Sequence, residues 1–371
     1  MEVEKYIKEI IYSQDYITID HMMSIAMTSE HNSYYKWQQP LGKEGDFITA
    51  PEISQMFGEM IGMWCVDLWY KLGSPPIELI ELGPGKGTLL KDALNSTKHV
   101  QGFHNALHLN LVEINYNLKK IQSNNLTEFK LPVKWFNSID QITNIYPTII
   151  LANEFFDVLP IKQYVKISSN WYERVIKVNN NDQLYFDTVN IDISNNNYKF
   201  LIEHFNAKNG AILEISPLRS LVIKAISNLL KKNDGGALII DYGYDIIPNI
   251  RTSSQYNCTL QSIKKHQYQP LLQNLGSSDI SSHVDFLACK KAAMAEAAVV
   301  FGTVSQNMLL HRLGIKTRLE MLKLMNYYDL TTKLNLNLQY DRLTSNKGMG
   351  ELFKAIAITS SNAIIPLGFN N

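Results

Sequence analysis

One short segment, residues 77–88, limits the possible folds of this chain more than any other feature. It reads Ile-Glu-Leu-Ile-Glu-Leu-Gly-Pro-Gly-Lys-Gly-Thr, so an apolar run ends in three glycines at alternate positions, and a helical pattern follows. Glycine lets the backbone turn sharply and lets a ligand approach without a Cβ in the way. The N–H groups at the start of the next helix are free to face that ligand. The segment therefore predicts a buried strand, a ligand-binding turn and a helix.

The spacing of the glycines distinguishes between nucleotide-like ligands. A dinucleotide turn reads Gly-x-Gly-x-x-Gly, whereas here the third glycine, Gly87, comes one residue early. A phosphate-binding Walker loop also fails, because it needs Gly-Lys-Ser or Gly-Lys-Thr after four spacer residues. An acid before Gly-x-Gly-x-Gly is typical of class I S-adenosylmethionine methyltransferases, in which Glu81 would hold the ammonium group of the ligand. We expect S-adenosylmethionine to contact Gly83, Pro84, Gly85, Gly87 and Thr88; the alternative is a tight turn without a ligand.

Two later strand ends complete the predicted ligand site. Residues 108–113 form a mostly apolar run that ends in Glu113, where a carboxylate can accept hydrogen bonds from both ribose hydroxyls. A solvated acid at a strand end is the alternative for Glu113 taken alone. The next run ends near Asn137, Ser138 and Ile139. Asn137 or Ser138 could bond the edge of the adenine and Ile139 could pack on its face, whereas the alternative is a plain turn.

From residue 77 onward, short apolar runs alternate with amphipathic stretches. Four of the runs read as buried strands, and they span residues 77–82, 107–114, 148–152 and 237–241. Strands that alternate with helices predict an α/β fold in which helices cover both faces of a mostly parallel sheet, the class I methyltransferase (Rossmann-like) arrangement. We expect residues 1–76 to form an N-terminal helical cap or lid, and residues 77–371 to form the methyltransferase domain.

Three insertions are expected in that domain. The first, at about 161–210, alternates apolar and polar residues around an Asn-Asn-Asn-Asp turn, which predicts a β-hairpin. The second, at about 244–284, is long, polar and without clear periodicity, as functional lids and substrate loops often are. The third, at about 305–345, is helical and lies between two last strands, at 297–304 and 353–359.

The balance of charge argues against a dedicated nucleic-acid binder. The 371 residues include 35 Lys and Arg against 35 Asp and Glu, so the chain has no general positive field. The three cysteines, Cys65, Cys258 and Cys289, form neither a disulfide framework nor a metal-spaced cluster, which fits a reducing compartment and predicts no metal. The acidic start of the chain has neither a secretory nor a mitochondrial leader pattern, and no apolar run approaches ~18 residues. We expect a cytoplasmic protein that does not insert into membranes.

Several motifs, in order over nearly the whole chain, resemble those of the MidA-like methyltransferases, a family that includes the mitochondrial complex I assembly factor 7 group. They are residues 45–59 (Gly-Asp-Phe-Ile-Thr-Ala-Pro-Glu-Ile-Ser-Gln-Met-Phe-Gly-Glu), 81–88, 152–160 (Ala-Asn-Glu-Phe-Phe-Asp-Val-Leu-Pro), 241–243, 259–261, 279–286 and 349–354. Two departures are small. Lys86 stands where arginine is more usual, and Asn-Cys-Thr-Leu at 257–260 stands where Gly-Asp-Thr-Leu is usual.

The resemblance implies methyl transfer from S-adenosylmethionine to a guanidinium nitrogen of a protein arginine. It also implies a substrate among the subunits of NADH:ubiquinone oxidoreductase (complex I), because the mitochondrial members act in the assembly of that enzyme. By analogy, a bacterial member would modify its own enzyme in the cytoplasm, and the alternative location is the mitochondrial matrix. Two other functions stay open: an assembly or binding protein with a vestigial nucleotide pocket, and a methyltransferase for another acceptor.

An arginine acceptor predicts carboxylates beside the ligand crevice. A guanidinium group is a poor nucleophile because it stays protonated and its lone pairs are delocalised, and acids that grip it can localise the charge. In Asn153-Glu154-Phe155-Phe156-Asp157, Glu154 is the first candidate for this clamp and Asp157 the second. We expect Asn153 to contact S-adenosylmethionine. The alternatives are a helix cap for Glu154 and a solvated carboxylate for Asp157.

His283 and Asp285 form the other candidate pair for catalysis. In an extended segment their side chains would point the same way, so the imidazole could accept or relay the proton that the methylated nitrogen loses. The alternative for both is a structural role.

The segment 46–59 precedes the glycine turn and can fold back over the ligand as a lid. Its candidate contacts are Thr49, Pro51, Glu52, Ser54 and Gln55. Capping of a helix by Thr49 or Ser54 is the alternative. His266, in the long polar segment, is a further candidate for substrate contact, and a solvated loop is the alternative there.

Overall fold

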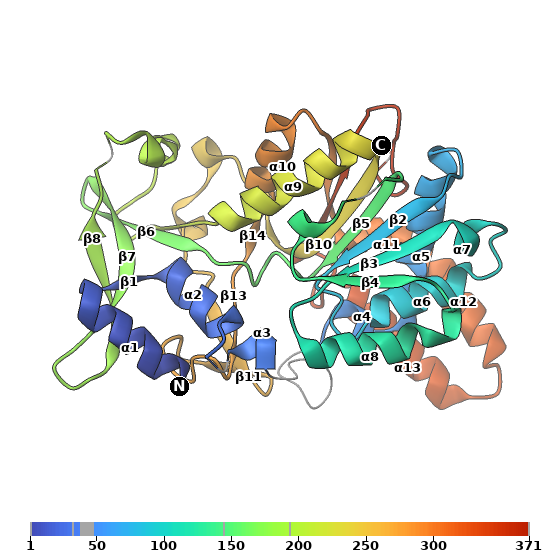
Figure 1. Ribbon diagram of the computed structural model, residues 1–371, viewed down its shortest axis with the longest axis horizontal. Helices are drawn as coiled ribbons and strands as arrows, with labels where there is room; N and C mark the ends of the chain where they lie inside the picture. The colour runs from blue at the N-terminus through green and yellow to red at the C-terminus, as the bar shows by residue number, and fades with distance from the viewer. Residues whose placement is uncertain (1, 32, 38–47, 144, 193, 370–371) are drawn as a thin grey trace.

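The computed structural model describes residues 2–31, 33–37, 48–143, 145–192 and 194–369. Its largest element is a mixed sheet, on the right of Figure 1. Along the main path of the sheet the strand order is β15, β16, β10, β5, β2, β3 and β4. The strands are β2 (Ile77–Leu82), β3 (Leu107–Val112), β4 (Val133–Phe136), β5 (Thr148–Asn153), β10 (Gly235–Tyr244), β15 (Val299–Ser305) and β16 (Phe353–Thr359).

The strands from β10 through β5, β2 and β3 to β4 are parallel, and β16 runs antiparallel to β10. β15 returns antiparallel to β16, and the short β14 (Val284–Asp285) pairs with the end of β10. A run of parallel strands brings the carboxyl ends to one edge of the sheet, where doubly wound folds bind their ligands. The mostly parallel sheet predicted from the alternating pattern is confirmed.

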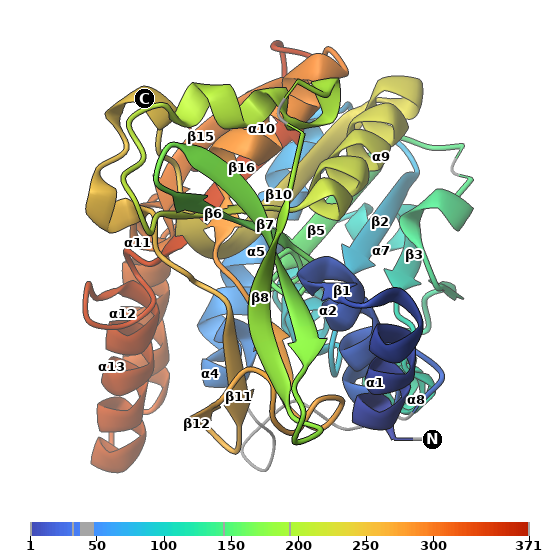
Figure 2. The ribbon, with the colours of Figure 1, turned by 90° about the vertical axis from the view of Figure 1, so that its left-hand side faces the viewer.

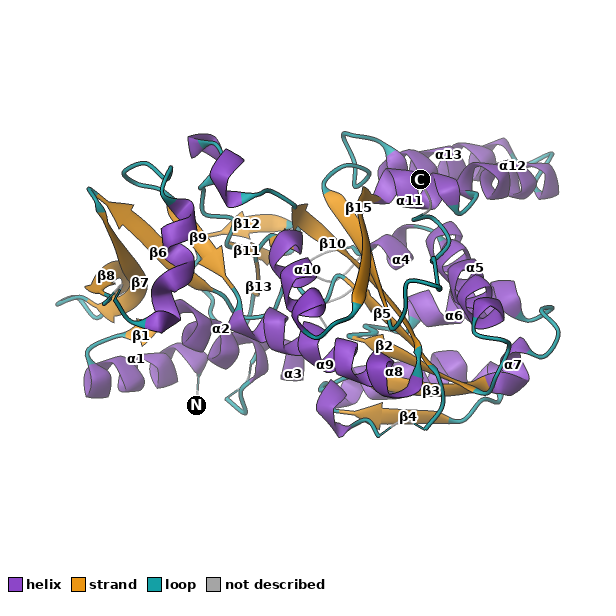
Figure 3. Ribbon diagram, turned by 90° about the horizontal axis from the view of Figure 1, so that it is seen from above, coloured by secondary structure: helices purple, strands orange, loops and turns teal. Residues whose placement is uncertain are grey.

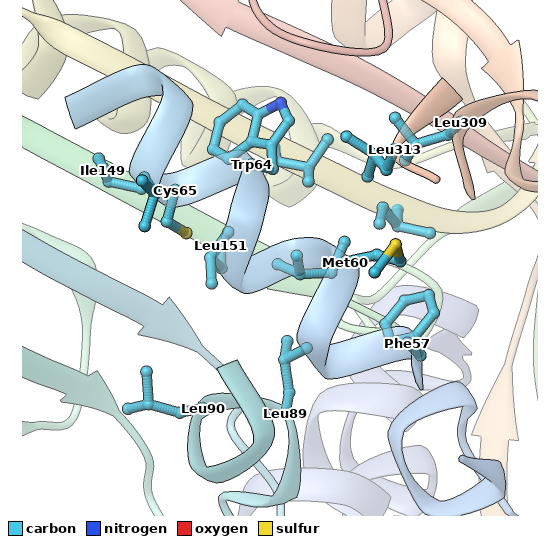
Figure 4. Packing of buried hydrophobic residues seen from close by; sticks show 14 of the residues in the cluster. Phe57, Met60, Trp64, Cys65, Leu89, Leu90, Ile149, Leu151, Leu309 and Leu313 are labelled. Atoms are coloured by element: carbon cyan, nitrogen blue, oxygen red, sulfur yellow. The ribbon is translucent and has the colours of Figure 1, made fainter. Parts of the chain in front are cut away.

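Helices cover both faces of this sheet (Figure 3). α5 (Gln55–Lys71) and α6 (Thr88–Thr97) share a core with Leu79 of β2, whereas α9 (Pro217–Asn233) and α10 (Phe286–Ala295) share the opposite core with Ile80. Burial of neighbouring residues on both faces explains why these strands read as continuous apolar runs. Figure 4 shows Trp64 of α5 in the same cluster as Leu151 of β5 and Leu309 of α11 (Gln306–Arg312).

A smaller lobe lies beside the large sheet, on the left of Figure 1. Its sheet has the order β1, β7, β6 and β9, and β8 pairs with β7. β7 and β8 form the inserted hairpin that the alternating pattern predicts. The strands are β1 (Ile17–Thr18), β6 (Lys162–Ile167), β7 (Asn170–Val178), β8 (Leu184–Asn190) and β9 (Ile212–Ile215).

The first 76 residues do not form one cap, which corrects the expected domain division. α1 (Val3–Gln14), α2 (Ile19–Thr28) and α3 (Tyr34–Trp37) belong to the smaller lobe, where α1 and α2 share a core with Ile176 of β7. Figure 2 looks onto this lobe, with α1 and α2 beside its strands. α4 (Ala50–Ile53) and α5 instead pack with the large sheet. An amphipathic helix does not encode which sheet it will cover, so the pattern could not divide the segment.

The polar segment at 244–284 holds more regular structure than its pattern indicated. A three-stranded sheet forms from β11 (Gln261–Lys264), β12 (Gln267–Gln269) and β13 (Asp279–Ser281), and Ile280 is buried in the core of the smaller lobe. Residues 305–345 hold α11, α12 (Ile315–Met325) and α13 (Leu330–Thr344). The remaining helices are α7 (Phe103–Ala106), α8 (Tyr116–Leu126) and the 3₁₀ turns η1 (Thr127–Phe129), η2 (Ile139–Gln141), η3 (Asn196–His204), η4 (Pro248–Ile250) and η5 (Ser253–Gln255). Within the described ranges, no helix is long and apolar enough to cross a membrane.

Candidate functional site

A cavity of about 360 Å³ lies where the carboxyl ends of β2, β3, β4 and β5 meet. The glycine turn and the residues after these strands form one side of its wall. α4, the start of α9, α2 and Tyr35 also contribute, together with Leu89 of α6 and Leu118 of α8. The cavity therefore lies between the large sheet and the smaller lobe, and both contribute to it.

The backbone of the turn after β2 requires its three glycines. The φ angles of Gly83, Gly85 and Gly87 are +62°, +55° and +79°, in the left-handed region that other residues disfavour. A Cβ on Gly83 would also lie 2.8 Å from Cδ2 of Phe155. Of the predicted contacts, Gly83, Pro84, Gly85 and Thr88 line the cavity. Gly87 shapes the turn from behind, and its N–H donates to the carbonyl of Pro84 at 2.7 Å.

Glu81 places a buried carboxyl group in the cavity wall. Its side chain is 3% exposed, and Oε2 has no hydrogen-bond partner among the described residues. Burial, and then the nearby charge of Glu113, raises the pKa of Glu81 to about 8. A buried carboxylate is costly unless a cation or donor pairs with it. The ammonium group of S-adenosylmethionine is such a cation, so this orphaned oxygen fits the predicted ligand.

Glu113 is held at the end of β3 by two donors. The N–H of Asn115 donates to its Oε1 at 2.8 Å, and Nε2 of Gln122 donates to its Oε2 at 3.1 Å. Burial raises the pKa of Glu113 to about 7, against the lowering effect of these hydrogen bonds. Each oxygen of the Glu113 carboxylate can accept one further hydrogen bond, so the two oxygens can still accept hydrogen bonds from the ribose hydroxyls.

Gln122 is a functional residue that sequence reasoning missed. Besides holding Glu113, its Nε2 donates to the carbonyl of Gly85 at 2.7 Å, and its Oε1 accepts from Nε1 of Trp135 at 2.8 Å. The amide is fully buried, and it links the ribose side of the cavity to the glycine turn. No local pattern marks this role, because only the packing of α8 brings Gln122 beneath the turn.

The predicted adenine contacts, Asn137, Ser138 and Ile139, all line the cavity. Ile139 is buried in the core, whereas the side-chain oxygen of Ser138 accepts from the N–H of Asp140 at 3.2 Å. Oδ1 of Asn137 accepts from Nζ of Lys119 at 2.9 Å. Asp140, which the sequence analysis did not select, also lines the cavity and is exposed. Because the adenine amino group donates hydrogen bonds, the Asp140 carboxylate suits it better than Ser138, which caps a local turn.

Asn153 and Glu154, at the end of β5, both lie in the cavity wall. Oδ1 of Asn153 is buried and has no partner in the described part of the chain. Oε1 of Glu154 accepts from the backbone N–H of Ala50 at 2.8 Å, at the start of α4. Burial raises the pKa of Glu154 to about 8, and the Ala50 N–H lowers it. Glu154 therefore caps a helix, as its alternative role predicts, and it also lines the cavity, so its role as a guanidinium clamp stays a prediction.

Asp157, the second clamp candidate, is buried behind the cavity and is not part of its described wall. Its Oδ1 has no partner among the described residues. Burial raises the pKa of Asp157 to about 6, and a hydrogen bond from Tyr242 and the charge of Arg219 act against that rise. The structure thus corrects both expectations for Asp157, since the side chain neither faces the cavity nor is solvated.

Asp241 and Arg219 hold the acidic segment in place. Oδ2 of Asp241 accepts from the N–H of Phe156 at 2.9 Å and from that of Asp157 at 3.2 Å. Arg219 donates from Nε to the carbonyl of Phe156 at 2.7 Å and from Nη2 to the carbonyl of Asp157 at 3.1 Å. Both side chains are buried, so these bonds fix the backbone that follows Glu154. The sequence marked Asp241 only as part of a motif.

His283 and Asp285 do not line the cavity in the described structure. The His283 ring packs edge-on against Tyr242, with centroids 5.4 Å apart at 87°, and burial lowers the pKa of its imidazole. Oδ1 of Asp285 accepts from the N–H of Ala288 at 3.0 Å and so caps α10. This differs from the expectation that the pair acts on the reacting nitrogen. The acid stands where a strand becomes a helix, and there it satisfies a free N–H group.

Part of the predicted lid closes the cavity. Thr49, Pro51 and Glu52 line it. Oε1 of Glu52 accepts from the hydroxyl of Thr88, and its Oε2 lies 3.5 Å from Nζ of Lys86. These contacts tie α4 to the glycine turn.

The other predicted substrate contacts lie elsewhere. The side-chain oxygen of Ser54 accepts from the N–H of Met56 at 3.3 Å and caps α5, and Gln55 donates to Glu59 at 3.0 Å. His266 is exposed in the turn between β11 and β12. None of the three belongs to the wall formed by the described residues. Residues 45–47 of the lid motif lie outside the described residues.

The smaller lobe supplies wall residues that sequence reasoning missed. Ser24, Met27 and Thr28 of α2 and Tyr35 line the cavity. The Tyr35 hydroxyl donates to Oδ1 of Asp279 at 2.7 Å, and its carbonyl accepts from Nδ2 of Asn115 at 2.8 Å. Tyr35 thereby joins the smaller lobe to the chain that follows Glu113.

Comparison with known proteins identifies a family profile and several relatives that share one name. A family profile described as "Putative S-adenosyl-L-methionine-dependent methyltransferase" matches residues 60–304. The chain is 32% identical to the mitochondrial protein arginine methyltransferase NDUFAF7 of Mus musculus over 367 residues, which cover 92% of this chain and 80% of the relative. The Homo sapiens protein of the same name is 30% identical with the same coverage. The Drosophila melanogaster homolog is 29% identical over 384 residues, which cover 95% and 84%.

Solved structures share the fold. A crystal structure from Burkholderia thailandensis bound to S-adenosyl-homocysteine superposes with a TM-score of 0.86 at 20% identity, covering 99% of this chain and 93% of that chain. A native crystal structure from the same organism gives a TM-score of 0.84 at 21% identity with the same coverage. At these identities the likeness shows the fold, and it agrees with the strand order described above.

Proposed function

Because this chain belongs to the family of S-adenosyl-L-methionine-dependent methyltransferases, we propose that its methyl acceptor is an arginine side chain of a protein. The mouse, human and fly relatives are protein arginine methyltransferases by name, which supports this acceptor. The observation that carries the proposal is the position of Glu154, a half-buried carboxyl group in the cavity wall beyond those that the methyl donor would use.

The acidic residues in the cavity wall are suited to different groups of the ligands, according to their positions. Glu81 is suited to the ammonium of the donor, Glu113 to its ribose and Asp140 to its adenine. Glu52 is already engaged with Thr88 and Lys86. Glu154 is the acid that remains for a second cation.

S-adenosylmethionine supplies a methyl group on a positively charged sulfur. The protein must hold the acceptor nitrogen in line with that group and close to it. The Glu154 carboxylate would draw the guanidinium charge away from the reacting nitrogen and stabilise the developing cation. Burial raises the pKa of Glu154 to about 8, so the carboxyl is mostly protonated at neutral pH until the charge of a bound guanidinium lowers that pKa. The carboxylate formed in this way can then take up the proton that the methylated nitrogen loses. The free Oδ1 of Asn153 is placed to accept a further N–H.

We also propose that the target is a subunit of NADH:ubiquinone oxidoreductase, because the motifs resemble those of the complex I assembly factor 7 group. The mitochondrial names of the relatives favour the mitochondrial matrix over a bacterial cytoplasm as the working compartment.

Methyl-labelled S-adenosylmethionine tests the acceptor. The full chain is incubated with the donor and with NADH:ubiquinone oxidoreductase from cells that lack the protein, and the products are hydrolysed to amino acids. We expect label in methylarginine, and its loss in Glu154→Gln with donor affinity retained. Glu128→Gln, which removes an exposed carboxylate after α8, is the matched control and should keep activity.

Three outcomes would contradict the proposal. Label in lysine or in a small molecule would assign another acceptor. Undiminished arginine methylation by Glu154→Gln would show that Glu154 does not act as the guanidinium clamp. Stable binding to the oxidoreductase without any label would favour the assembly role.

A further inference from the structure

The helical insertion carries an apolar ridge on its solvent side. On α13, Leu330, Leu334 and Leu338 are 78%, 60% and 58% exposed. Because they recur every fourth residue, they lie in one row along the helix. The inward face of the same helix is separate, since Leu336 and Leu343 are the buried apolar residues of α13.

α12 repeats this arrangement. Its buried residues are Ile315, Leu319 and Leu322, which face the core of the large sheet. Met321, Leu324, Met325 and the connecting Tyr327 and Tyr328 are exposed. The solvent face of a helix is normally polar, so a second apolar face indicates a surface that another molecule covers.

These eight residues, which we call the hairpin patch, are Met321, Leu324, Met325, Tyr327, Tyr328, Leu330, Leu334 and Leu338. They expose roughly 1,000 Å² of side chain, which is about what one partner contributes to a stable interface. A scattered exposed leucine needs no explanation, but eight large exposed apolar side chains on two contacting helices and their connection do.

The charge on and around the patch suits a second copy of the same chain. Between residues 330 and 340 the sequence has one charged residue, Lys333, whose Nζ donates to the carbonyl of Tyr327 at 2.6 Å. Beside the α12 half of the patch, Nζ of Lys323 lies 2.8 Å from Oε1 of Glu320, and Asp329 caps α13. Charges of both signs therefore flank the patch, and the zero net charge of the chain adds no long-range repulsion between copies.

We propose that the hairpin patch is the contact between two copies of this chain in a two-fold dimer. In such a contact the ridge of one α13 packs on the same ridge of the other, with Leu334 at its centre near the axis. Figure 3 shows α11, α12 and α13 together at one margin of the molecule, on the side away from the smaller lobe. Two copies can thus join while the smaller-lobe side of the cavity stays open.

The dimer would also support the site, because α13 contacts α4, the helix that Glu154 caps. Fixing α13 against a partner would restrict the element that carries the lid residues.

Analytical ultracentrifugation of the full chain, over about a hundredfold range of concentration, tests the contact. We expect a dimer, and we expect Leu334→Glu to weaken it by roughly 30-fold or more, because the substitution buries a charge at the centre of the interface. Asn228→Glu places the same charge on the exposed face of α9 and should leave the dimer intact. Circular dichroism melting should show both variants folded, since both positions are exposed.

A chain that stays monomeric at every concentration would overturn the proposal, and so would a dimer that Leu334→Glu leaves unchanged. Co-flotation with vesicles of phosphatidylglycerol and phosphatidylcholine tests the alternative that the hairpin patch binds a lipid surface. If the wild type is monomeric and floats, and Leu334→Glu does not, the patch binds a lipid surface and not a second copy.

Discussion

The backbone N–H of Ala50 donates to Oε1 of Glu154 at 2.8 Å, although the two residues are 104 positions apart. One carboxyl group therefore holds the first turn of α4, which carries lid residues, and lines the cavity in which the acceptor is expected. Loss of this carboxyl should affect closure of the site as well as chemistry, and two substitutions separate the effects.

Glu154→Gln keeps an oxygen that can accept from Ala50 but loses the charge. We expect it to fold normally and to lower kcat for arginine methylation by about 10²-fold or more. Glu154→Ala also removes the cap and should in addition lose about 1 kcal/mol of unfolding free energy. Denaturation curves and steady-state rates measure the two effects, and equal stability of the two variants would contradict a capping role.

Gly83→Ala should impair donor binding. The new Cβ would lie 2.8 Å from the Phe155 ring, at a φ angle of +62°. We expect a loss of about 1 kcal/mol or more in stability and of about tenfold or more in affinity for S-adenosylmethionine. Calorimetry measures the affinity. Gly73→Ala has a similar φ of +86° but no atom within 4 Å of the new Cβ, so it should lose stability without losing affinity.

Asp241 acts as a positioning residue for the acidic segment. Asp241→Ala would leave the N–H groups of Phe156 and Asp157 buried and unpaired, at a cost of about 2–4 kcal/mol. Asp241→Asn keeps one oxygen acceptor and should recover part of this loss. If the role is positioning, KM for the protein substrate should rise more in Asp241→Asn than the Kd for the donor. An equal change in both would indicate a general loss of structure.

Affinity for S-adenosylmethionine should rise with pH until about 8. The pKa of Glu81 is raised to about 8 in the free protein, so the carboxyl is protonated below that pH and must lose its proton to pair with the ammonium group. Binding should therefore release a proton below pH 8, and affinity should fall again at higher pH, because the α-ammonium group of the free donor then loses its own proton. Calorimetry in buffers of different ionisation enthalpy measures the release. Glu81→Gln should abolish it, and an unchanged release would assign the proton elsewhere.

Asp285 should matter for stability and not for methyl transfer. Its carboxylate caps α10, so Asp285→Ala should lose about 1 kcal/mol of unfolding free energy and keep kcat at wild-type level. Asp285→Ser can still cap the helix and should restore most of the stability. A large fall in kcat for Asp285→Ser would instead indicate that Asp285 takes part in methyl transfer.

The parts of the site that the sequence predicts come from strand ends. Glu81 lies near the end of an apolar strand, and Glu113 and Glu154 directly follow two others. Parallel pairing carries all three strand ends to one edge of the sheet. The sequence also predicts the glycine turn, because the backbone conformation of this turn tolerates few residues other than glycine. The same reasoning is wrong for Asp157, which lies four residues beyond the end of β5, because at that distance the strand no longer determines whether a side chain faces the cavity or the core.

The sequence pattern does not predict contacts between segments that are far apart along the chain. Gln122 reaches the turn only because α8 packs beside it, and Tyr35 reaches the cavity only because the first helices fold on the smaller sheet. Neither residue carries a local pattern that differs from an ordinary helix or loop. Asp285 has a chemically suggestive neighbour in His283, yet the helix start that it caps determines its use.

The class of fold, the glycine turn and the acids at the strand ends follow from the amino-acid sequence alone, because backbone sterics and the order of parallel strands leave few alternatives. The tertiary structure decided which acids face the cavity, how the first 76 residues divide between two sheets, and that Glu154 holds α4. These outcomes depend on how apolar faces pack against one another, and packing joins residues whose separation along the chain leaves no periodic signal.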